Sequence, residues 1–202
     1  MILSIVQYGD PILRTKGKRI EKIDGHIREL AANMIETMHA AHGVGLAAQQ
    51  IGEALQLTVI DVSQVEDRPS TMKLNAKDVD PAIAMPLVLI NPEIELRGRT
   101  EMGVEGCLSF PEISADIARS KSAIAHAQTL QGDNVEIEAG GLLSRVIQHE
   151  FDHLHGILFI DRMNSAVKAA LSSRLKRLQN ESRRGKRIRP EEEQSLVTET
   201  TL

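Results

Sequence analysis

Two histidines and one glutamate stand close together in Gln148-His149-Glu150-Phe151-Asp152-His153-Leu154. If this segment is helical, residues four apart share a face, so the imidazoles of His149 and His153 can reach one metal ion. Glu150 would stand beside that ion, where it can take a proton from a water. The spacing indicates metal-dependent hydrolysis, and the alternative is a helix whose histidines only face solvent.

A third ligand has to come from elsewhere, because catalytic metal sites use three protein ligands and keep a fourth position open. The candidates are Cys107, His155 and Asp152. Neither Asp152 nor His155 shares the helix face of both motif histidines. Cys107 lies between Gly106 and Pro111, in a segment that could approach the helix closely. A lone cysteine could equally be a small buried hydrophobic residue.

Helical patterns appear in three places. One helix is expected over 141–155, ending at Gly156, and would carry the histidines. Another is expected from Asp24, a capping residue, to about His42, because its apolar residues recur at helical spacing. The third begins near Asn164, and its apolar stripe consists of Val167, Ala170, Leu171, Leu175 and Leu178.

The region between these helices predicts strands. Residues 43–52 are expected to form a turn and a tight strand, and residues 63–86, with three prolines, a long surface loop. The order of helix, mixed strands and helices predicts an α+β fold rather than a parallel βαβ sheet. The expected longer strands are Leu57–Val62, Leu87–Ile90, Ile94–Leu96, Ala123–Gln128 and Val135–Glu138.

Length and composition suit a globular protein. The chain has 202 residues and 42% hydrophobic residues, enough to bury a core without disulfides. Its single cysteine cannot form an internal disulfide, which favours a reducing compartment. The N-terminus lacks a basic region followed by a long apolar stretch, and no apolar run reaches the length of a membrane span. We therefore expect a cytoplasmic protein that does not use the membrane.

Charge divides the chain unevenly. Residues 1–163 contain 15 basic and 23 acidic residues, whereas residues 164–202 contain 9 basic and 5 acidic ones. We expect a catalytic domain over 1–163, a basic C-terminal helix over 164–189 and a disordered tail over 190–202. The charge of the basic helix leaves two interpretations open, a solvated surface and a membrane-surface contact.

Three segments in this order resemble those of the peptide deformylase family. They are Gly43-Val44-Gly45-Leu46-Ala47-Ala48-Gln49-Gln50, Glu105-Gly106-Cys107-Leu108-Ser109 and Gln148-His149-Glu150-Phe151-Asp152-His153-Leu154. The similarity runs from about Ile5 to Asp161. It implies mainly antiparallel sheets packed around a central metal-binding helix, followed by a C-terminal helix. It also implies removal of formate from N-formylmethionine on nascent polypeptides. For the basic C-terminal helix it implies a third interpretation, docking on the ribosome through contacts to RNA phosphates.

The resemblance also implies a role for each matching residue. Cys107, His149 and His153 would bind the metal, Fe(2+) in this family, with Zn(2+), Ni(2+) or Co(2+) able to replace it. Glu150 would deprotonate a water at the metal and pass the proton to the leaving amine.

The remaining roles concern the substrate. Gln50 and the backbone N–H of Leu108 would stabilise the oxyanion, and Gly45 would let the peptide backbone come close. Val44, Leu142 and Val146, with the ring of His149, would line the methionine pocket. Alternatively, Leu142 and Val146 are ordinary core residues.

The chain departs from the family pattern in three places. Gln49 replaces the proline of many relatives. Ile113-Ser114 stands where many bacterial relatives have a basic or amide side chain that holds the peptide. The segment 63–86 is longer than in compact relatives. The group that grips the peptide beyond methionine is therefore not identified by the resemblance.

Overall fold

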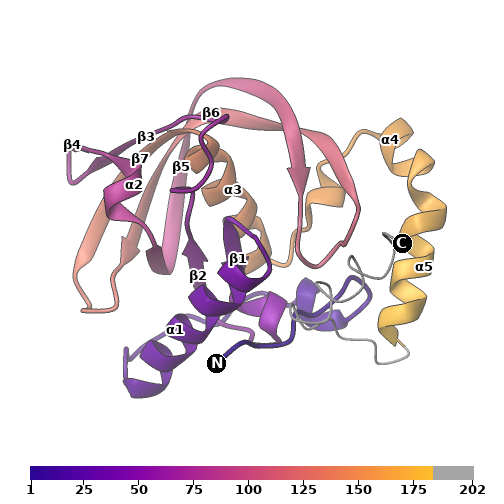
Figure 1. Ribbon diagram of the computed structural model, residues 1–202, viewed down its shortest axis with the longest axis horizontal. Coiled ribbons are helices and arrows are strands. Elements are labelled where there is room, and N and C mark those ends of the chain that lie inside the picture. The colour runs from indigo at the N-terminus through magenta and orange to yellow at the C-terminus, as the bar shows by residue number, and fades with distance from the viewer. Residues whose placement is uncertain (184–202) are drawn as a thin grey trace, which may run out of the picture.

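The computed structural model describes residues 1–183, which form one seven-stranded antiparallel sheet and five α-helices (Figure 1). The strand order is β1-β2-β5-β6-β7-β3-β4. The predicted α+β class with mainly antiparallel strands is confirmed. The strands are β1 Gly45–Ala47, β2 Leu57–Ile60, β3 Ser70–Leu74, β4 Lys77–Val79, β5 Leu87–Gly106, β6 Ser114–Gln128 and β7 Asn134–Gly141. The helices are α1 Gly25–Ala40, α2 Pro81–Ala84, α3 Leu142–Leu154, α4 Ser165–Ala170 and α5 Ser172–Arg183.

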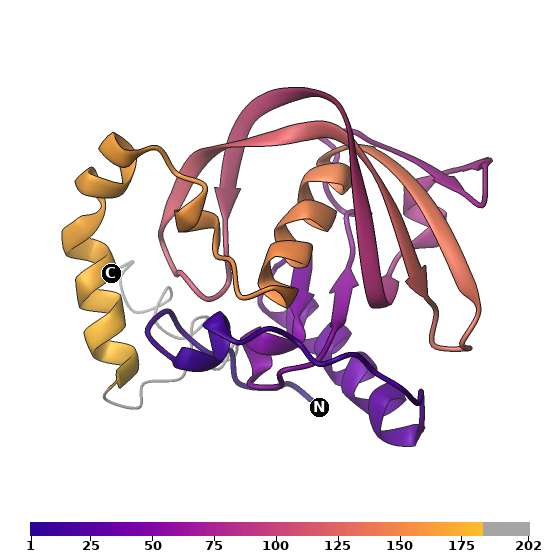
Figure 2. The ribbon, with the colours of Figure 1, turned by 180° about the vertical axis from the view of Figure 1, so that it is seen from behind.

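Helix α3 occupies the middle of the molecule. The long β5–β6 hairpin arches over it, and α1 lies at the other side of β1 and β2 (Figure 2). The arch follows from two register shifts in the β5–β6 pairing, between Ile90 and Glu93 and between Arg97 and Thr100, since bulges bend a strand pair. Twelve of the thirteen α3 residues are buried as a result. The side chains of this helix are thus held by neighbours on nearly every side.

Helix α1 begins where the sequence predicts. The Asp24 side chain accepts a hydrogen bond from the Ile27 N–H at 3.1 Å, which satisfies one of the unpaired donors of the first turn. Its predicted apolar stripe packs against β1 and β2, with Met34 and Met38 fully buried. The helix supports strand β1, which carries Gly45, and the 3-10 helix Ala48–Ile51 that follows it and carries Gln50.

The prediction of a loop over 63–86 is wrong. Strands β3 and β4 form a hairpin there, and β3 continues the sheet by pairing with β7. The prolines flank elements instead of interrupting them, since Pro69 precedes β3 and Pro81 begins α2. Asn75 and Ala76 turn the hairpin with φ of 48° and 63°, and Met72 buries its side chain in the core. Two turn residues of positive φ suit a tight hairpin better than a loop.

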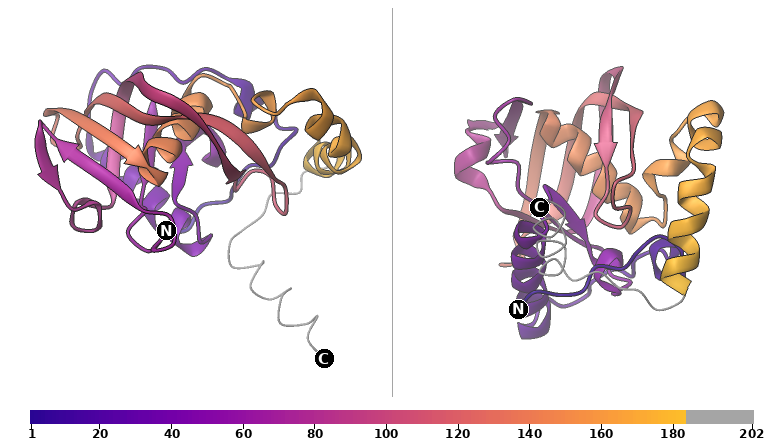
Figure 3. Two further views of the ribbon diagram at one scale, coloured as in Figure 1. Left: turned by 90° about the horizontal axis from the view of Figure 1, so that it is seen from above. Right: turned by 45° about the vertical axis from the view of Figure 1, so that its right-hand side comes forward.

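Two further predictions need adjustment. The separate strands expected at 87–90 and 94–96 are parts of the single strand β5. The helix expected from Asn164 is divided at Leu171 into α4 and α5, which stand beside the tip of the β5–β6 hairpin (Figure 3). Leu175 and Leu178 pack into the core that contains Phe110 and Phe159.

The far C-terminal predictions lie outside the described residues. These are the basic residues from Arg184 to Arg189 and the tail over 190–202. Within residues 1–183, no helix combines the length and the hydrophobicity that crossing a membrane requires.

Candidate active site

Helix α3 and the turn after β5 bring three metal-ligating side chains together. The ligand atoms of Cys107, His149 and His153 lie within 4.8 Å of one another, and Cys107 Sγ lies 3.3 Å from His153 Nε2. His149 and His153 are buried, and Cys107 is half-buried. A thiolate with two imidazoles is a donor set that suits iron(II), zinc or other divalent first-row metals. The three residues therefore fit a metal ion.

The two other candidate ligands have different roles. Asp152 accepts hydrogen bonds from Arg119 and Arg162, at 2.5 Å and 2.6 Å. The His155 ring donates from Nδ1 to the Phe151 carbonyl at 2.8 Å, within its own helix turn. Both side chains are thus engaged away from the sulfur of Cys107, so the helix does not supply the third ligand.

Glu105 fixes the orientation of the His149 ring. Its Oε2 lies 3.0 Å from His149 Nδ1, and since a carboxylate only accepts, Nδ1 carries the hydrogen and Nε2 presents its lone pair to the metal site. Burial alone would raise the pKa of Glu105, but hydrogen bonds from His149 and Arg119 outweigh it and lower this pKa to about 2. Glu105 therefore stays ionised at neutral pH.

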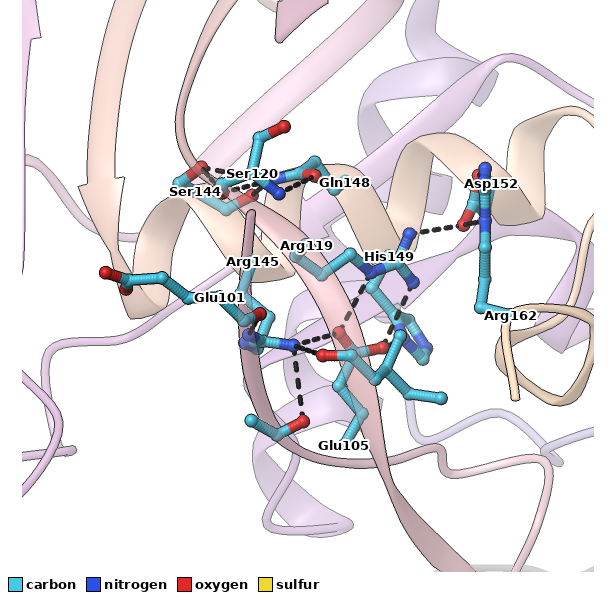
Figure 4. Close-up of polar contacts among 12 residues, drawn as sticks. Glu101, Glu105, Arg119, Ser120, Ser144, Arg145, Gln148, His149, Asp152 and Arg162 are labelled. Atoms are coloured by element: carbon cyan, nitrogen blue, oxygen red, sulfur yellow. Dashed lines mark hydrogen bonds and ion pairs between the residues drawn. The ribbon is translucent and has the colours of Figure 1, made fainter. Parts of the chain in front are cut away.

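A buried ionic cluster surrounds Glu105, as Figure 4 shows. Arg119 donates to both Glu105 oxygens, at 2.9 Å and 3.0 Å, and also to Asp152. Arg145 donates to Glu105 and to three carbonyls, those of Glu101, Gly103 and Ile117. The cluster ties α3 to β5 and β6. Sequence reasoning missed it, although charged residues on an otherwise apolar helix were a signal.

Glu150 lies on α3 beside the metal-ligating group. It is buried, and its Oε2 has no hydrogen-bond partner within residues 1–183. Desolvation raises the pKa of Glu150 to about 7, which is the range that suits a group that takes and returns a proton near neutral pH. A Cβ on Gly45 would clash with Glu150 Oε1. Gly45 therefore leaves room for this carboxylate as well as for a substrate.

Gln50 and Leu108 flank the same site. Gln50 Oε1 accepts from the Ala47 N–H at 2.8 Å, so its Nε2 points to Cys107 Sγ at 3.5 Å and to Ser109 Oγ at 3.4 Å. The Leu108 N–H has no acceptor within residues 1–183. Leu108 follows Cys107 directly and lines the same cavity as Gln50, so an oxyanion in this cavity could accept from both N–H groups.

The N-terminal segment braces these donors. Val6 N–H donates to the Gln50 carbonyl at 2.7 Å, and Tyr8 N–H donates to the Ser109 carbonyl at 2.9 Å. The Gln7 side chain donates to the Leu108 carbonyl at 3.4 Å. Residues at the start of the chain therefore hold both donor loops in place, which sequence patterns alone did not indicate.

A cavity of ≈ 560 Å³ opens over the site. Of the residues that the sequence analysis singled out, it is lined by Val44, Gly45, Gln50, Cys107, Leu108, Leu142, Val146, His149 and Glu150. Leu142 and Val146 line this cavity and also belong to a core cluster. The two interpretations of these residues are therefore compatible.

The chain is similar in sequence and in structure to known proteins. A sequence model described as Polypeptide deformylase matches residues 2–169. The peptide deformylase of Methylacidiphilum infernorum is 45% identical over 178 residues, 88% of this chain and 93% of that protein. The peptide deformylase of Opitutus terrae is 41% identical over 192 residues, 94% of this chain and 100% of that protein. The crystal structure of the Thermotoga maritima peptide deformylase, 40% identical, matches with a TM-score of 0.69 over 81% of this chain and 99% of that one. The chain belongs to the polypeptide deformylase family.

Proposed function

We propose that this enzyme is a metal-dependent hydrolase that removes the formyl group from N-formylmethionine at the start of new polypeptides. The observation that carries the proposal is the meeting of three metal-ligating side chains, one buried carboxylate and two N–H donors around a single cavity. The family supplies the substrate class. We place the enzyme in the cytoplasm, because the thiol of Cys107 needs a reducing compartment to act as a ligand.

Each group has a distinct task in the proposed reaction. A divalent metal, Fe(2+) in the first instance, would polarise the formyl carbonyl and lower the pKa of a water. Glu150 accepts the proton of that water and returns it to the departing amine. Gln50 Nε2 and the Leu108 N–H donate to the oxygen as negative charge builds on it, and each such donor contributes about 3–4 kcal/mol in comparable sites.

The peptide itself can bind as an added strand. Strand β1 is at the edge of the sheet, and the β5 residues from Met102 to Gly106 pair with β6 on one side. Both β1 and this part of β5 contribute residues to the cavity wall. An extended peptide can therefore lie between them and use their backbone groups, with its methionine side chain directed to Val44, Leu142 and Val146.

Metal loading tests the proposal. Protein purified without oxygen and loaded with Fe(2+) is expected to release formate from formyl-Met-Ala-Ser. Removal of the metal by a chelator should abolish the release, and Fe(2+), Ni(2+) or Co(2+) should restore it, because the metal would supply the acidified water that attacks the formyl carbon. A formate dehydrogenase assay with metal analysis measures both. Absence of formate from the fully loaded protein would refute the proposed function.

We also propose that the basic C-terminal helix contacts ribosomal RNA. On α5, Leu175 and Leu178 face the core, which leaves Lys176 and Arg177 exposed. Exposed cations on a helix anchored from its other face suit binding to phosphates. The apolar contacts also mean that cutting the chain at Asn164 would damage the core, so charge substitutions are the cleaner test.

The double variant Lys176→Glu/Arg177→Glu is expected to weaken binding to ribosomes. The slope of log affinity against log salt should fall by roughly two, one for each lost phosphate contact. Co-sedimentation at several salt concentrations measures it. The control, Lys22→Glu/Arg28→Glu, makes the same charge change at two other exposed positions, one just before α1 and one within it. Equal effects of the two double variants would contradict the proposal.

A further inference from the structure

A second cavity, of ≈ 370 Å³, adjoins the active-site cavity. The two share part of their walls, namely Arg68, Val104, Leu142 and Arg145. The second cavity is additionally lined by Arg119 and Lys121, against one carboxylate, that of Glu101. Its walls are therefore strongly basic, and it opens beside the place where the substrate peptide is proposed to lie.

The cations of this cavity are not equally available to a ligand. Arg119 and Arg145 donate to Glu105, to Asp152 or to backbone carbonyls, so their charges are largely compensated. Lys121 is exposed and lies 3.8 Å from Glu101, a carboxylate that Arg99 also contacts. Arg68 is half-buried and has no carboxylate within ion-pair distance in residues 1–183. Of the cations that line this cavity, Arg68 is thus the one whose charge is least compensated by neighbouring carboxylates.

The backbone around Arg68 is held firmly. Pro69 O accepts from the Leu142 N–H at 3.3 Å, and Ser70 Oγ accepts from the Leu143 N–H at 3.0 Å. Ser70 is also paired with Gly141 where β3 joins β7. These contacts fasten the segment to the first turn of α3, whose next turns carry the catalytic residues. These backbone contacts of the 63–86 segment therefore hold Arg68 at the cavity wall that the two cavities share.

The position that holds the peptide in many relatives is neutral in this chain. Ser114 lines the active-site cavity there, and its hydroxyl brings no charge. Val104, in the wall that the two cavities share, is 56% exposed and belongs to the strand β5, which presents apolar side chains outward there. A peptide strand beside it would direct alternate side chains toward the shared wall.

We propose that Arg68, assisted by Lys121, forms an anion subsite that binds an acidic side chain of the substrate within the first residues after methionine. This inference rests on the proposed deformylase activity and adds a substrate preference to it. Partly buried cations without an internal partner attract a carboxylate more strongly than fully solvated ones do. Arg68 would then act as a specificity-determining residue supplied by the segment 63–86.

The test compares formylated tetrapeptides that carry Asp, Ala or Lys at the second, third or fourth position. For at least one position, kcat/KM is expected to be about three- to fivefold higher for Asp than for Ala at low ionic strength, mainly through KM. In Arg68→Gln this ratio should fall to near one, and in Arg68→Glu the Lys peptide should become the better substrate. The matched control is Arg28→Gln, which removes an exposed arginine of α1 and should keep the wild-type ratio.

Two results would overturn the subsite. One is the absence of any preference for Asp at all three positions, and the other is an Asp preference that Arg68→Gln retains in full. Failure of the proposed function gives a different result, because then no peptide of the series, charged or neutral, releases formate. Inclusion of Arg68→Glu keeps the test independent of folding, since a reversed preference cannot come from a general loss of stability.

Discussion

Replacing Glu150 by glutamine is expected to lower kcat for formyl-Met-Ala-Ser by about 10³-fold while leaving the metal in place. The side chain is buried, its Oε2 has no partner within residues 1–183, and its pKa is raised to about 7 by desolvation. It is therefore poised to accept and return a proton, which contributes on the order of 10²–10⁴ in comparable enzymes. Glutamine keeps the shape beside Gly45 but cannot accept the proton.

Three measurements define this result. Formate release gives kcat and KM, metal analysis gives the occupancy, and a thermal melt shows that the fold is intact. The control is Glu112→Gln, whose carboxylate lines the same cavity but is 81% exposed and pairs loosely with Arg174. We expect that variant to lose less than about threefold. A Glu150→Gln enzyme with near wild-type kcat would assign the proton transfer to another group.

Local patterns were sufficient to predict the catalytic helix. Its two histidines and Glu150 occupy neighbouring turns, and the helix that carries them ends one residue from where the sequence indicated. Asp24 capped α1 as expected, because a cap depends on residues three apart. Cys107 was different, since it lies 42 residues before His149 and spacing alone could not choose it. Only its resemblance to a family segment separated it from a buried thiol.

The missed features depend on contacts between distant segments. The sequence of β3 resembles that of a loop, because the strand is stabilised by pairing with β7, some 65 residues later. The role of Arg145 depends on carbonyls of β5 and β6 that lie 28 to 44 residues earlier. Arg68 sits in a segment that sequence analysis set aside, and only the packing of Pro69 against α3 places it at the cavity. Hydrophobic periodicity and secondary-structure propensity describe one helix or strand at a time, so they do not reveal contacts between segments that are far apart in the sequence.

Replacing Arg119 by methionine is expected to destabilise the protein by about 3 kcal/mol. Arg119 is 4% exposed and donates to both Glu105 and Asp152, so its removal leaves two buried carboxylates with one cation fewer. Arg145 and Arg162 still pair with these carboxylates, which keeps the expected loss at the lower end of the range for broken buried ion pairs. Urea unfolding at pH 7 measures it. The control is Arg97→Met, which breaks an exposed pair with Glu95 and should cost under about 1 kcal/mol.

The free energy of unfolding at acidic pH gives a second measurement of the effect of Arg119→Met. The pKa of Glu105 is about 2 in the folded protein, below its ordinary value of 4.5. At pH values above 4.5, the ionised Glu105 side chain therefore stabilises the fold by about 3 kcal/mol. That contribution is lost as the pH falls from about 4.5 toward 2, because the unfolded chain takes up the proton first. In Arg119→Met, the two hydrogen bonds from Arg119 that lower the pKa of Glu105 are missing, so the stability lost over that pH window should be smaller than in the wild type. An equal loss in the two proteins would mean that Arg119 does not stabilise the Glu105 carboxylate, and that His149 and Arg145 hold it alone.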